Sequence, residues 1–303
     1  MAYELLVISV GVLLYGLSMI PGYLLIQWGH GLGLPWVVFT YPTAFYLFII
    51  TLILLAGTVK RLCLPPLKPG TYKFNKDKHV FTWFLSRTIT EYVLMPFNRV
   101  IFTNDLLRYT CLRLFGVKLD YSSGISSSFI SDLELLSFGK NCMIGGWAIL
   151  YGHIEPEPGT VILAPISIGD NTLIGARANI TCGSSIGNNT IIGFGVVMGV
   201  NCKIGNRCNV GYITHMGHQI LIEDDVKVGK YCNLGNGVKI RTGIKLPDYS
   251  MVPDFTTIAT QDLAETFRSV RISEIQGPGM ATQHPPRRPQ VFIRSGSSSS
   301  SNT

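Results

Sequence analysis

The stretch "ISIGDNTLIGARANITCGSSIGNNTIIG", residues 166–193, repeats with a period of six residues. Stepping by six from Ile168, every position through Ile258 is aliphatic or Met, sixteen positions in all. A period of six fits neither a helix nor an ordinary alternating strand. It is typical of a chain that turns a corner every six residues and stacks coil on coil, with one large side chain per hexad pointing into a narrow prism. The repeat therefore predicts an all-β left-handed parallel β-helix with three hexads in each coil.

A second position of the hexad is also restricted in size. The residue four places after each large one is small or β-branched, and four cysteines occupy this slot: Cys142, Cys202, Cys208 and Cys232. Free cysteine behaves as a small buried hydrophobe, so we interpret these residues as core. The total of seven cysteines lacks the paired spacing of a disulfide framework or a zinc site, and no metal ligands are predicted.

Glycine follows the large residue at ten of the sixteen steps. It suits a corner that needs either an unusual backbone angle or a close approach to the neighbouring coil.

Counting back from Ile168 in sixes gives Ile162, Pro156, Leu150, Ile144 and Phe138. The register is therefore expected to continue through "LYGHIEPEPGTVILAP", residues 150–165, although Pro156 cannot fill a large apolar slot. Before this stretch, an irregular first coil begins the predicted β-helix domain, residues 117–260.

The first region of the chain, residues 1–60, is apolar. Between Leu5 and Val59 there is no Lys, Arg, Asp or Glu, and "GHGLGLP", residues 29–35, divides the run into two segments of about membrane-spanning length. We predict two transmembrane helices, residues 3–28 and 36–59. A mean hydropathy of +0.32 and a charged fraction of 14% are also unusual for a soluble protein.

Basic residues are distributed unevenly about these two segments. Six lysines and arginines lie within residues 60–78, whereas the turn between the segments has none. Because cytoplasmic loops are enriched in such residues, we predict a multi-pass membrane protein with both termini and the β-helix domain on the cytoplasmic side. The formal charge of +7 is interpreted as attraction to anionic membrane lipids, because no nucleic-acid motif accompanies it.

Three further segments complete the predicted organisation. Residues 61–116 carry helical apolar spacing with interspersed arginines, which favours membrane-proximal, interfacial helices. The stretch "QDLAETFRSVRISEI", residues 261–275, predicts a capping helix. Residues 276–303 are rich in Pro, Gly, Arg and Ser, and this composition predicts a disordered tail.

A prism filled by its own side chains leaves its outer faces, loops and subunit clefts for chemistry. Three of the six histidines fall on the prism: His153, His215 and His218. His153 lies in the faltering stretch beside two glutamates, and imidazole can act as a general base near neutral pH. His215 and His218 flank Met216 and should point outward. The alternative is that these histidines have no catalytic role. His153 would then be an exposed loop residue, and His215 and His218 would be surface residues at a corner.

The stretch "AILYGHIEPEPGTVILAPISIGDNTLIGARANITCGSSIGNNTIIGFGVVM" resembles hexapeptide-repeat acyltransferases of the galactoside and xenobiotic acetyltransferase kind. Their catalytic histidine precedes a run similar to "PISIGDNTLIG", which implies His153 as the base. "LPPLKPGTYKF", "DLLRYTCLRLFGVKLD" and "DLELLSFGKN" extend a resemblance to the membrane-anchored β-helix region of poly-lysine synthetase-like proteins, over about residues 52–253.

A competing resemblance concerns "THMGHQILIEDDVKVG". It is similar to the H-x-x-H-D stretch of UDP-N-acetylglucosamine acyltransferases and sialic-acid-type O-acetyltransferases, which implies His218 as the base, although Gln219 replaces their Asp. The resemblance also implies acetyl-CoA, another acyl-CoA or an acyl-carrier protein as donor. Its last coils would contact the coenzyme, with three basic candidates: Lys239, Arg241 and Lys245.

These resemblances imply a membrane-anchored acyltransferase that moves an acyl group, expected to be acetyl, from a thioester to a hydroxyl or amine. The acceptor would be a glycan, a lipid-linked molecule or an amino acid, and the family implies a homotrimer with sites between neighbours. One alternative is a non-catalytic trimeric membrane scaffold. Another is a γ-carbonic-anhydrase-like zinc hydratase, whose three histidines the H-x-x-H spacing here does not match.

Overall fold

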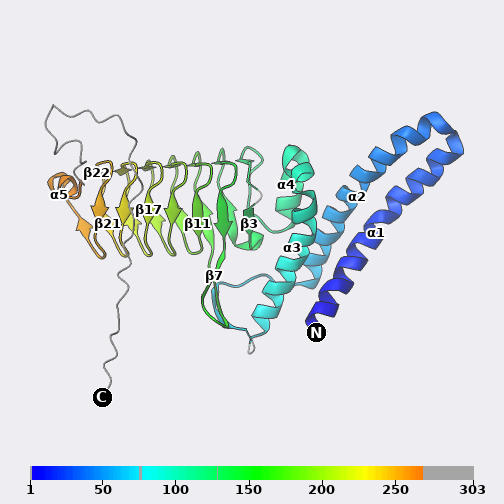
Figure 1. The fold of residues 1–303 in the computed structure, drawn as a ribbon, viewed down its shortest axis with the longest axis horizontal. Helices are drawn as coiled ribbons and strands as arrows, with labels where there is room; N and C mark the ends of the chain where they lie inside the picture. The colour runs from blue at the N-terminus through cyan, green and yellow to red at the C-terminus, as the bar shows by residue number, and fades with distance from the viewer. Residues whose placement is uncertain (1, 75–76, 128, 269–303) are drawn as a thin grey trace, which may run out of the picture. The chain divides into compact units, whose positions relative to one another are not determined.

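The computed structural model describes residues 2–74, 77–127 and 129–268. Two long helices, α1 (Ala2–Leu32) and α2 (Leu34–Cys63), run side by side in opposite directions (Figure 1). Gly33 joins them with a φ of 100°, a backbone angle that favours glycine. Near this turn the helices approach so closely that a Cβ at Gly29 would lie 2.3 Å from Thr40 Cγ2.

The surface of this helical hairpin is apolar. By length and composition both helices could cross a membrane, because the most apolar 18-residue windows within Glu4–Leu32 and Leu34–Cys63 have mean hydropathies of 2.0 and 2.1. Only 22% and 28% of their most apolar windows are buried, which is unlike the core helix of a soluble protein. Large side chains such as Val12 and Phe39 are exposed by 66% and 68%. The predicted pair of long apolar helices is therefore present.

Two more helices follow, in the segment where helical spacing was predicted. They are α3 (Lys78–Thr103), capped by Asp77, and α4 (Asp105–Leu114), capped by Asn104. Helix α3 contacts the hairpin, because the Tyr92 hydroxyl donates a hydrogen bond to the Val7 carbonyl at 3.0 Å. The apolar face of α3 is thus shared with α1 and α2 as well as with the β-domain.

The β-domain is a parallel β-solenoid of about seven turns with three flat faces, and its successive coils are stacked in Figure 1. The first face contains β2 (Gly124–Ile125), β5 (Met143–Ile144), β10 (Leu173–Ile174), β13 (Ile191–Ile192), β16 (Asn209–Val210), β19 (Lys227–Val228) and β22 (Lys245–Leu246). The second contains β3 (Phe129–Ser131), β6 (Ile149–Tyr151), β11 (Asn179–Thr181), β14 (Val197–Met198), β17 (His215–Met216), β20 (Asn233–Leu234) and β23 (Met251–Val252). The third contains β4 (Leu136–Phe138), β9 (Ile166–Ile168), β12 (Ser185–Ile186), β15 (Lys203–Ile204), β18 (Leu221–Ile222), β21 (Lys239–Ile240) and β24 (Thr257–Ile258). The predicted fold class is confirmed.

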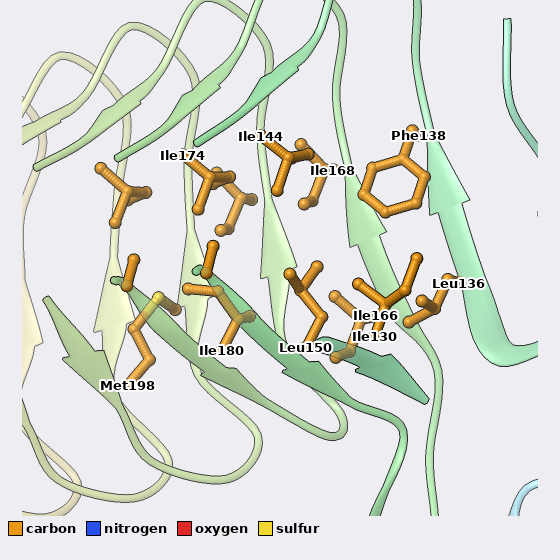
Figure 2. Close-up of a cluster of buried hydrophobic side chains, with 14 of the residues drawn as sticks. Ile130, Leu136, Phe138, Ile144, Leu150, Ile166, Ile168, Ile174, Ile180 and Met198 are labelled. Carbon is orange, nitrogen blue, oxygen red and sulfur yellow. The ribbon is translucent and has the colours of Figure 1, made fainter. Parts of the chain in front are cut away.

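The core of the solenoid consists of the large hexad residues. Figure 2 shows Ile174, Ile168 and Phe138 in one layer and Ile180 and Leu150 in another, all directed into the prism. Each two-residue strand contributes one such side chain inward and its neighbour outward, because successive side chains of a strand point to opposite faces. The period of six therefore produces a continuous column of buried aliphatic side chains.

We expect the inward and outward members of a strand to differ in their contribution to stability. Ile192 is fully buried, whereas its neighbour Ile191 is 43% exposed. Ile192→Ala should lower the free energy of unfolding by about 2–5 kcal/mol, because it removes buried methyl groups and leaves a cavity. Ile191→Ala, the matched control, should stay within about 0.5 kcal/mol. Chemical denaturation of both variants checks this, and equal losses would contradict the assignment of faces.

The hexad glycines serve the close approach of coils, not an unusual backbone angle. Gly175 has no left-handed φ, but a Cβ built on it would lie 2.6 Å from the Gly193 carbonyl carbon in the next coil. The left-handed angle falls two residues later, at positions such as Asn171 (φ 54°) and Arg177 (φ 58°). Of the two reasons predicted for these glycines, only the approach of the neighbouring coil applies.

The small inward slot satisfies polar backbone groups at the corners. The Thr172 hydroxyl donates to the Gly187 carbonyl at 2.8 Å, and the Cys208 thiol makes the equivalent contact to the Glu223 carbonyl at 3.0 Å. The four cysteines predicted for this slot are buried. Thiol and hydroxyl groups thus have the same structural role here, which explains why cysteine alternates with threonine.

Burial should also make these thiols unreactive. The pKa of Cys182 is raised to about 11 by burial, so only about one in a thousand of its thiols would be ionised at pH 8. Of the seven cysteines, Cys63 alone is exposed. We expect an alkylating reagent to label Cys63 alone in the native protein at pH 8 and the other cysteines only after denaturation. Mass spectrometry of the labelled sites would test this, and rapid native labelling of Cys182 would contradict it.

The expected register through residues 150–165 is wrong. Between β6 and β11 the paired residues Leu150 and Ile180 are 30 apart, whereas later neighbours such as Ile180 and Met198 are 18 apart. Twelve residues are therefore inserted, and they form β7 (His153–Glu157) and β8 (Thr160–Leu163), an antiparallel hairpin that leaves the stack (Figure 1). Because twelve is twice six, the six-residue step stays in phase across the insertion, although Pro156 and Ile162 lie outside the prism.

The end of the described chain is a short helix, α5 (Gln261–Thr266). It begins at Thr260, whose side chain accepts a hydrogen bond from the Leu263 amide. The helix covers the first part of the predicted capping segment, residues 261–275, and ends at Thr266. The remainder of that segment from residue 269, and the tail predicted for residues 276–303, lie outside the described residues.

Candidate active site

The inserted hairpin presents His153 to a carboxylate of the first coil. His153 Nδ1 lies 2.5 Å from Asp132 Oδ2, and the other oxygen, Oδ1, accepts a hydrogen bond of 2.7 Å from Trp83 Nε1. An ionised carboxylate only accepts hydrogen bonds, so Nδ1 is the donor and Nε2 of the neutral ring carries the lone pair. This arrangement fixes the tautomer and orientation that a histidine base needs.

The backbone around Asp132 is built for this contact. Asp132 has the left-handed angles φ 55° and ψ 50° and precedes the short 3₁₀ helix η1 (Leu133–Leu135), and its side chain is fully buried. Gly152, just before the histidine, allows the hairpin to pass close by, since a Cβ there would lie 3.0 Å from Asp132 Cβ. Trp83 is buried and packs edge-on against the His153 ring at 5.0 Å.

The segment between the apolar hairpin and α3 holds the inserted strands in place. Strand β1 (Gly70–Lys73) pairs with β8, so β1, β8 and β7 form a separate antiparallel sheet. A second hydrophobic cluster lies against this sheet, made of Val80, Trp83, Leu135, Val161 and Leu163. Residues from α3, the first coil and the insertion thus share one core, which rigidly positions His153.

A cavity of about 310 Å³ opens beside this pair, between α3 and the first two coils. Its polar lining is Ser86, Arg87, Thr90, Glu91, Asn98, Ser131, Asp132, Glu134, Tyr151 and His153, and its apolar lining is Leu94, Met95, Phe129 and Ile130. The cavity is bounded by α3, which also packs on the apolar helical hairpin. It therefore combines a candidate base, further polar groups and an apolar wall in one cavity.

A buried ion pair connects the hairpin to the same coil. Lys60, in the last turn of α2, lies 3.0 Å from Glu134 Oε1 and donates a hydrogen bond of 2.8 Å to the Thr90 hydroxyl. Ser86 donates to the same Glu134 oxygen at 2.6 Å. Helices α2 and α3 and the coil that carries Asp132 are therefore joined through charged and hydroxyl side chains.

The other two candidate histidines have different surroundings. Both are exposed, as expected from their positions beside Met216. His218 Nδ1 accepts a hydrogen bond of 2.9 Å from the Val200 amide, and the His218 amide donates to Asn236 Oδ1 at 2.8 Å. At other corners an Asn or Asp side chain accepts the equivalent bond. With Nδ1 used in this way, neutral His218 carries its proton on Nε2, which then is a donor and not a base.

The basic candidates for coenzyme contact are not brought together near His153. Lys239 lies in β21 on the third face and Lys245 in β22 on the first face. Arg241, at the corner between them, is paired with Glu223 Oε1 at 2.5 Å. From β4 to β21 there are five strand spacings, roughly 24 Å. Arg87 is the cationic residue that lines the cavity itself.

Within the described parts of the chain, no group of three or more His, Cys, Asp and Glu side chains has the arrangement of a metal site. His153, His215 and His218 are not gathered in one place. The residues that sequence reasoning missed are Asp132, Trp83, Glu134 and Lys60. A signal existed for two of them, because the irregular first coil contains "SDLEL" with both carboxylates.

Comparison with known proteins bears on the repeats. Residues 165–200 match the family model described as bacterial transferase hexapeptide (six repeats). No curated protein matches the chain. The match identifies hexapeptide repeats within the predicted solenoid, and these repeats fit a hexapeptide-repeat acyltransferase.

Three of the solved structures that are similar to part of the chain are acyltransferases by name. UDP-N-acetylglucosamine O-acyltransferase (LpxA) from Moraxella catarrhalis RH4 is 20% identical over 48% of this chain and 65% of its own, with a TM-score of 0.27. LpxA from Bacteroides fragilis 9343 is 22% identical over 53% of this chain and 67% of its own, with a TM-score of 0.27. A mutant of GDP-perosamine N-acetyltransferase from Caulobacter crescentus, in complex with CoA and GDP-perosamine, is 16% identical over 55% of this chain and 70% of its own, with a TM-score of 0.20. The chain spans about two thirds, 65%, of the length of the Moraxella protein.

Proposed function

We propose that this protein is a membrane-anchored acyltransferase that moves an acyl group, of which acetyl is the simplest, from a thioester to a hydroxyl or amine. The observation that carries the proposal is the pair of His153 and the fully buried Asp132, 2.5 Å apart at the wall of a cavity of about 310 Å³. A histidine held by a buried carboxylate is suited to general-base catalysis.

The reaction follows from this geometry. Nε2 of His153 takes the proton from the acceptor's O–H or N–H as the oxygen or nitrogen attacks the thioester carbonyl carbon. The carbon–sulfur bond then breaks, and the protonated Nε2 returns its proton to the leaving thiolate. Asp132 stabilises the transient imidazolium, and Trp83 holds the carboxylate in place through its 2.7 Å hydrogen bond. The products are the acylated acceptor and a free thiol.

The donor in this proposal is acetyl-CoA, another acyl-CoA or an acyl-carrier protein. Lys239, Arg241 and Lys245 remain the proposed phosphate contacts, although Arg241 would have to exchange Glu223 for a phosphate. Within one chain these cations lie several coils from His153. In the proposed homotrimer, the donor would lie in a cleft between neighbouring copies.

The membrane part of the proposal rests on the exposed apolar surface of α1 and α2, because a contiguous apolar surface of this size is unfavourable in water. The basic residues after α2 favour cytoplasmic termini and a cytoplasmic solenoid. The full-length protein should remain in the membrane pellet after washing with alkaline carbonate and should require detergent for extraction. Release by carbonate alone would contradict the anchor.

The catalytic part is tested with the purified full-length protein in detergent. It should transfer the acetyl group of acetyl-CoA to small hydroxyl or amine acceptors, or at least hydrolyse the thioester, as measured by thiol release. A protein without activity toward acetyl-CoA, longer acyl-CoA and acyl-carrier protein would favour the non-catalytic scaffold. The zinc hydratase predicts bound zinc instead, which elemental analysis of the same sample would detect.

A further inference from the structure

One carboxylate oxygen of Glu134 accepts no hydrogen bond from the described residues. Glu134 lines the same cavity as His153, and its Oε1 already contacts Lys60 and Ser86. Its second oxygen, Oε2, is buried and has no hydrogen-bond partner among the described residues. Leaving a buried carboxylate oxygen unpaired is costly, so a ligand's donor group that reached Oε2 from the cavity would remove this cost.

The charges around the cavity restrict the kind of ligand that could carry this hydrogen-bond donor. Three carboxylates line it, Glu91, Asp132 and Glu134, together with one cationic side chain, Arg87. Arg87 is paired with Glu91 at 2.7 Å, and Lys60 offsets Glu134 from the helical side. With His153 neutral, one negative charge remains on Asp132. A phosphate or carboxylate close to the reacting group would be repelled, whereas a neutral hydroxyl or a cation would not.

We propose that Glu134 forms the acceptor subsite, in which Oε2 accepts a hydrogen bond from a second hydroxyl or an ammonium group of the acceptor while His153 deprotonates the reacting group. The acceptor is then a neutral polyol or an amino alcohol without a phosphate beside the reacting group. This inference rests on the proposed acyl transfer and specifies its acceptor. Glu134 binds substrate in this assignment and takes no part in proton transfer.

The test uses acetyl-CoA and the full-length protein with four acceptor probes: glycerol, ethanolamine, 1-propanol and glycerol 3-phosphate. The wild-type protein should acetylate glycerol and ethanolamine with a kcat/KM about tenfold or more above that for 1-propanol, since a hydrogen bond to a charged group is worth about this much. Glycerol 3-phosphate should be a poorer acceptor than glycerol. Glu134→Gln should raise the KM for glycerol by about tenfold while leaving the values for 1-propanol unchanged.

Glu155→Gln is the matched control, because Glu155 is an exposed carboxylate of the same inserted hairpin and does not line the cavity. It should keep the preference for glycerol. If Glu134→Gln does not fold, the pair Lys60→Met with Glu134→Gln removes both charges together and should lose the same preference. Equal losses for glycerol and 1-propanol in both variants would show a purely structural role and overturn the subsite.

Two other outcomes separate this inference from the proposed function. Thioester hydrolysis by the wild-type protein without transfer to glycerol or ethanolamine, or a preference for glycerol 3-phosphate, would overturn the acceptor subsite and leave the acyltransferase proposal standing. No hydrolysis and no transfer with any probe would instead refute the acyltransferase proposal itself.

Discussion

Replacing His153 by alanine is expected to lower kcat for acyl transfer by about 10²–10⁴-fold, the usual contribution of a positioned general base. Substrate binding should change little, since Nε2 acts on the proton of the acceptor and not on the donor. Asp132→Asn should cause a loss of the same order, because the amide no longer holds the ring in the tautomer that leaves Nε2 free. Initial rates with acetyl-CoA and a fixed acceptor would measure both.

The matched control for this experiment is His218→Asn. The asparagine can replace Nδ1 as acceptor of the Val200 amide hydrogen bond, as Asn188 and Asn206 do at equivalent corners. The variant should therefore retain its fold and its activity. The opposite result, an inactive His218→Asn variant and a fully active His153→Ala variant, would identify His218 as the general base instead. Far-UV circular dichroism of every variant confirms that the solenoid is intact.

The second large effect is expected at the buried ion pair. Lys60→Met should lower the free energy of unfolding by about 3–5 kcal/mol, because it leaves the Glu134 carboxylate without its counter-charge in a site where the two side chains are only 4% and 20% exposed. The double variant Lys60→Met with Glu134→Leu should recover most of this loss, since it removes both charges. Denaturant unfolding of the detergent-solubilised protein measures both values.

An exposed pair provides the comparison. Arg207 and Asp225 make two contacts of 2.7 Å at a solenoid corner, but their side chains are 56% and 45% exposed. Arg207→Gln should therefore change the free energy of unfolding by less than about 1 kcal/mol. A loss in Lys60→Met no larger than in this control would contradict the role of Lys60 in joining α2 to the first coil.

The fold followed from the sequence because it is periodic. Each hexad repeats the same local pattern of one large inward residue, one small inward residue and one close corner. Ile174 and Ile240, eleven hexads apart in the sequence, therefore occupy equivalent positions on two faces without any long-range information. The two apolar helices were predictable for a similar reason, since a long uncharged run identifies them from composition alone. Irregular segments lack such repetition.

The site was only partly predictable. His153 was identified because it interrupts the pattern, but the pattern could not show that the interruption leaves the prism, since an insertion of two hexads preserves the count of six. Asp132 precedes His153 by 21 residues and Trp83 precedes Asp132 by 49. These separations have no local signature, because side chains that distant meet only after α3 has packed on the first coil.

By itself, the sequence determined a β-solenoid preceded by two apolar helices, and it singled out a histidine in its least regular stretch. The tertiary structure alone decided that this histidine is paired with Asp132, that Lys60 at the end of α2 is paired with Glu134, and that His153, Asp132 and Glu134 line one cavity. The physical reason is that periodic side-chain burial is a local property of the chain. A constellation of charges instead depends on contacts between α2, α3, the inserted hairpin and the first coil.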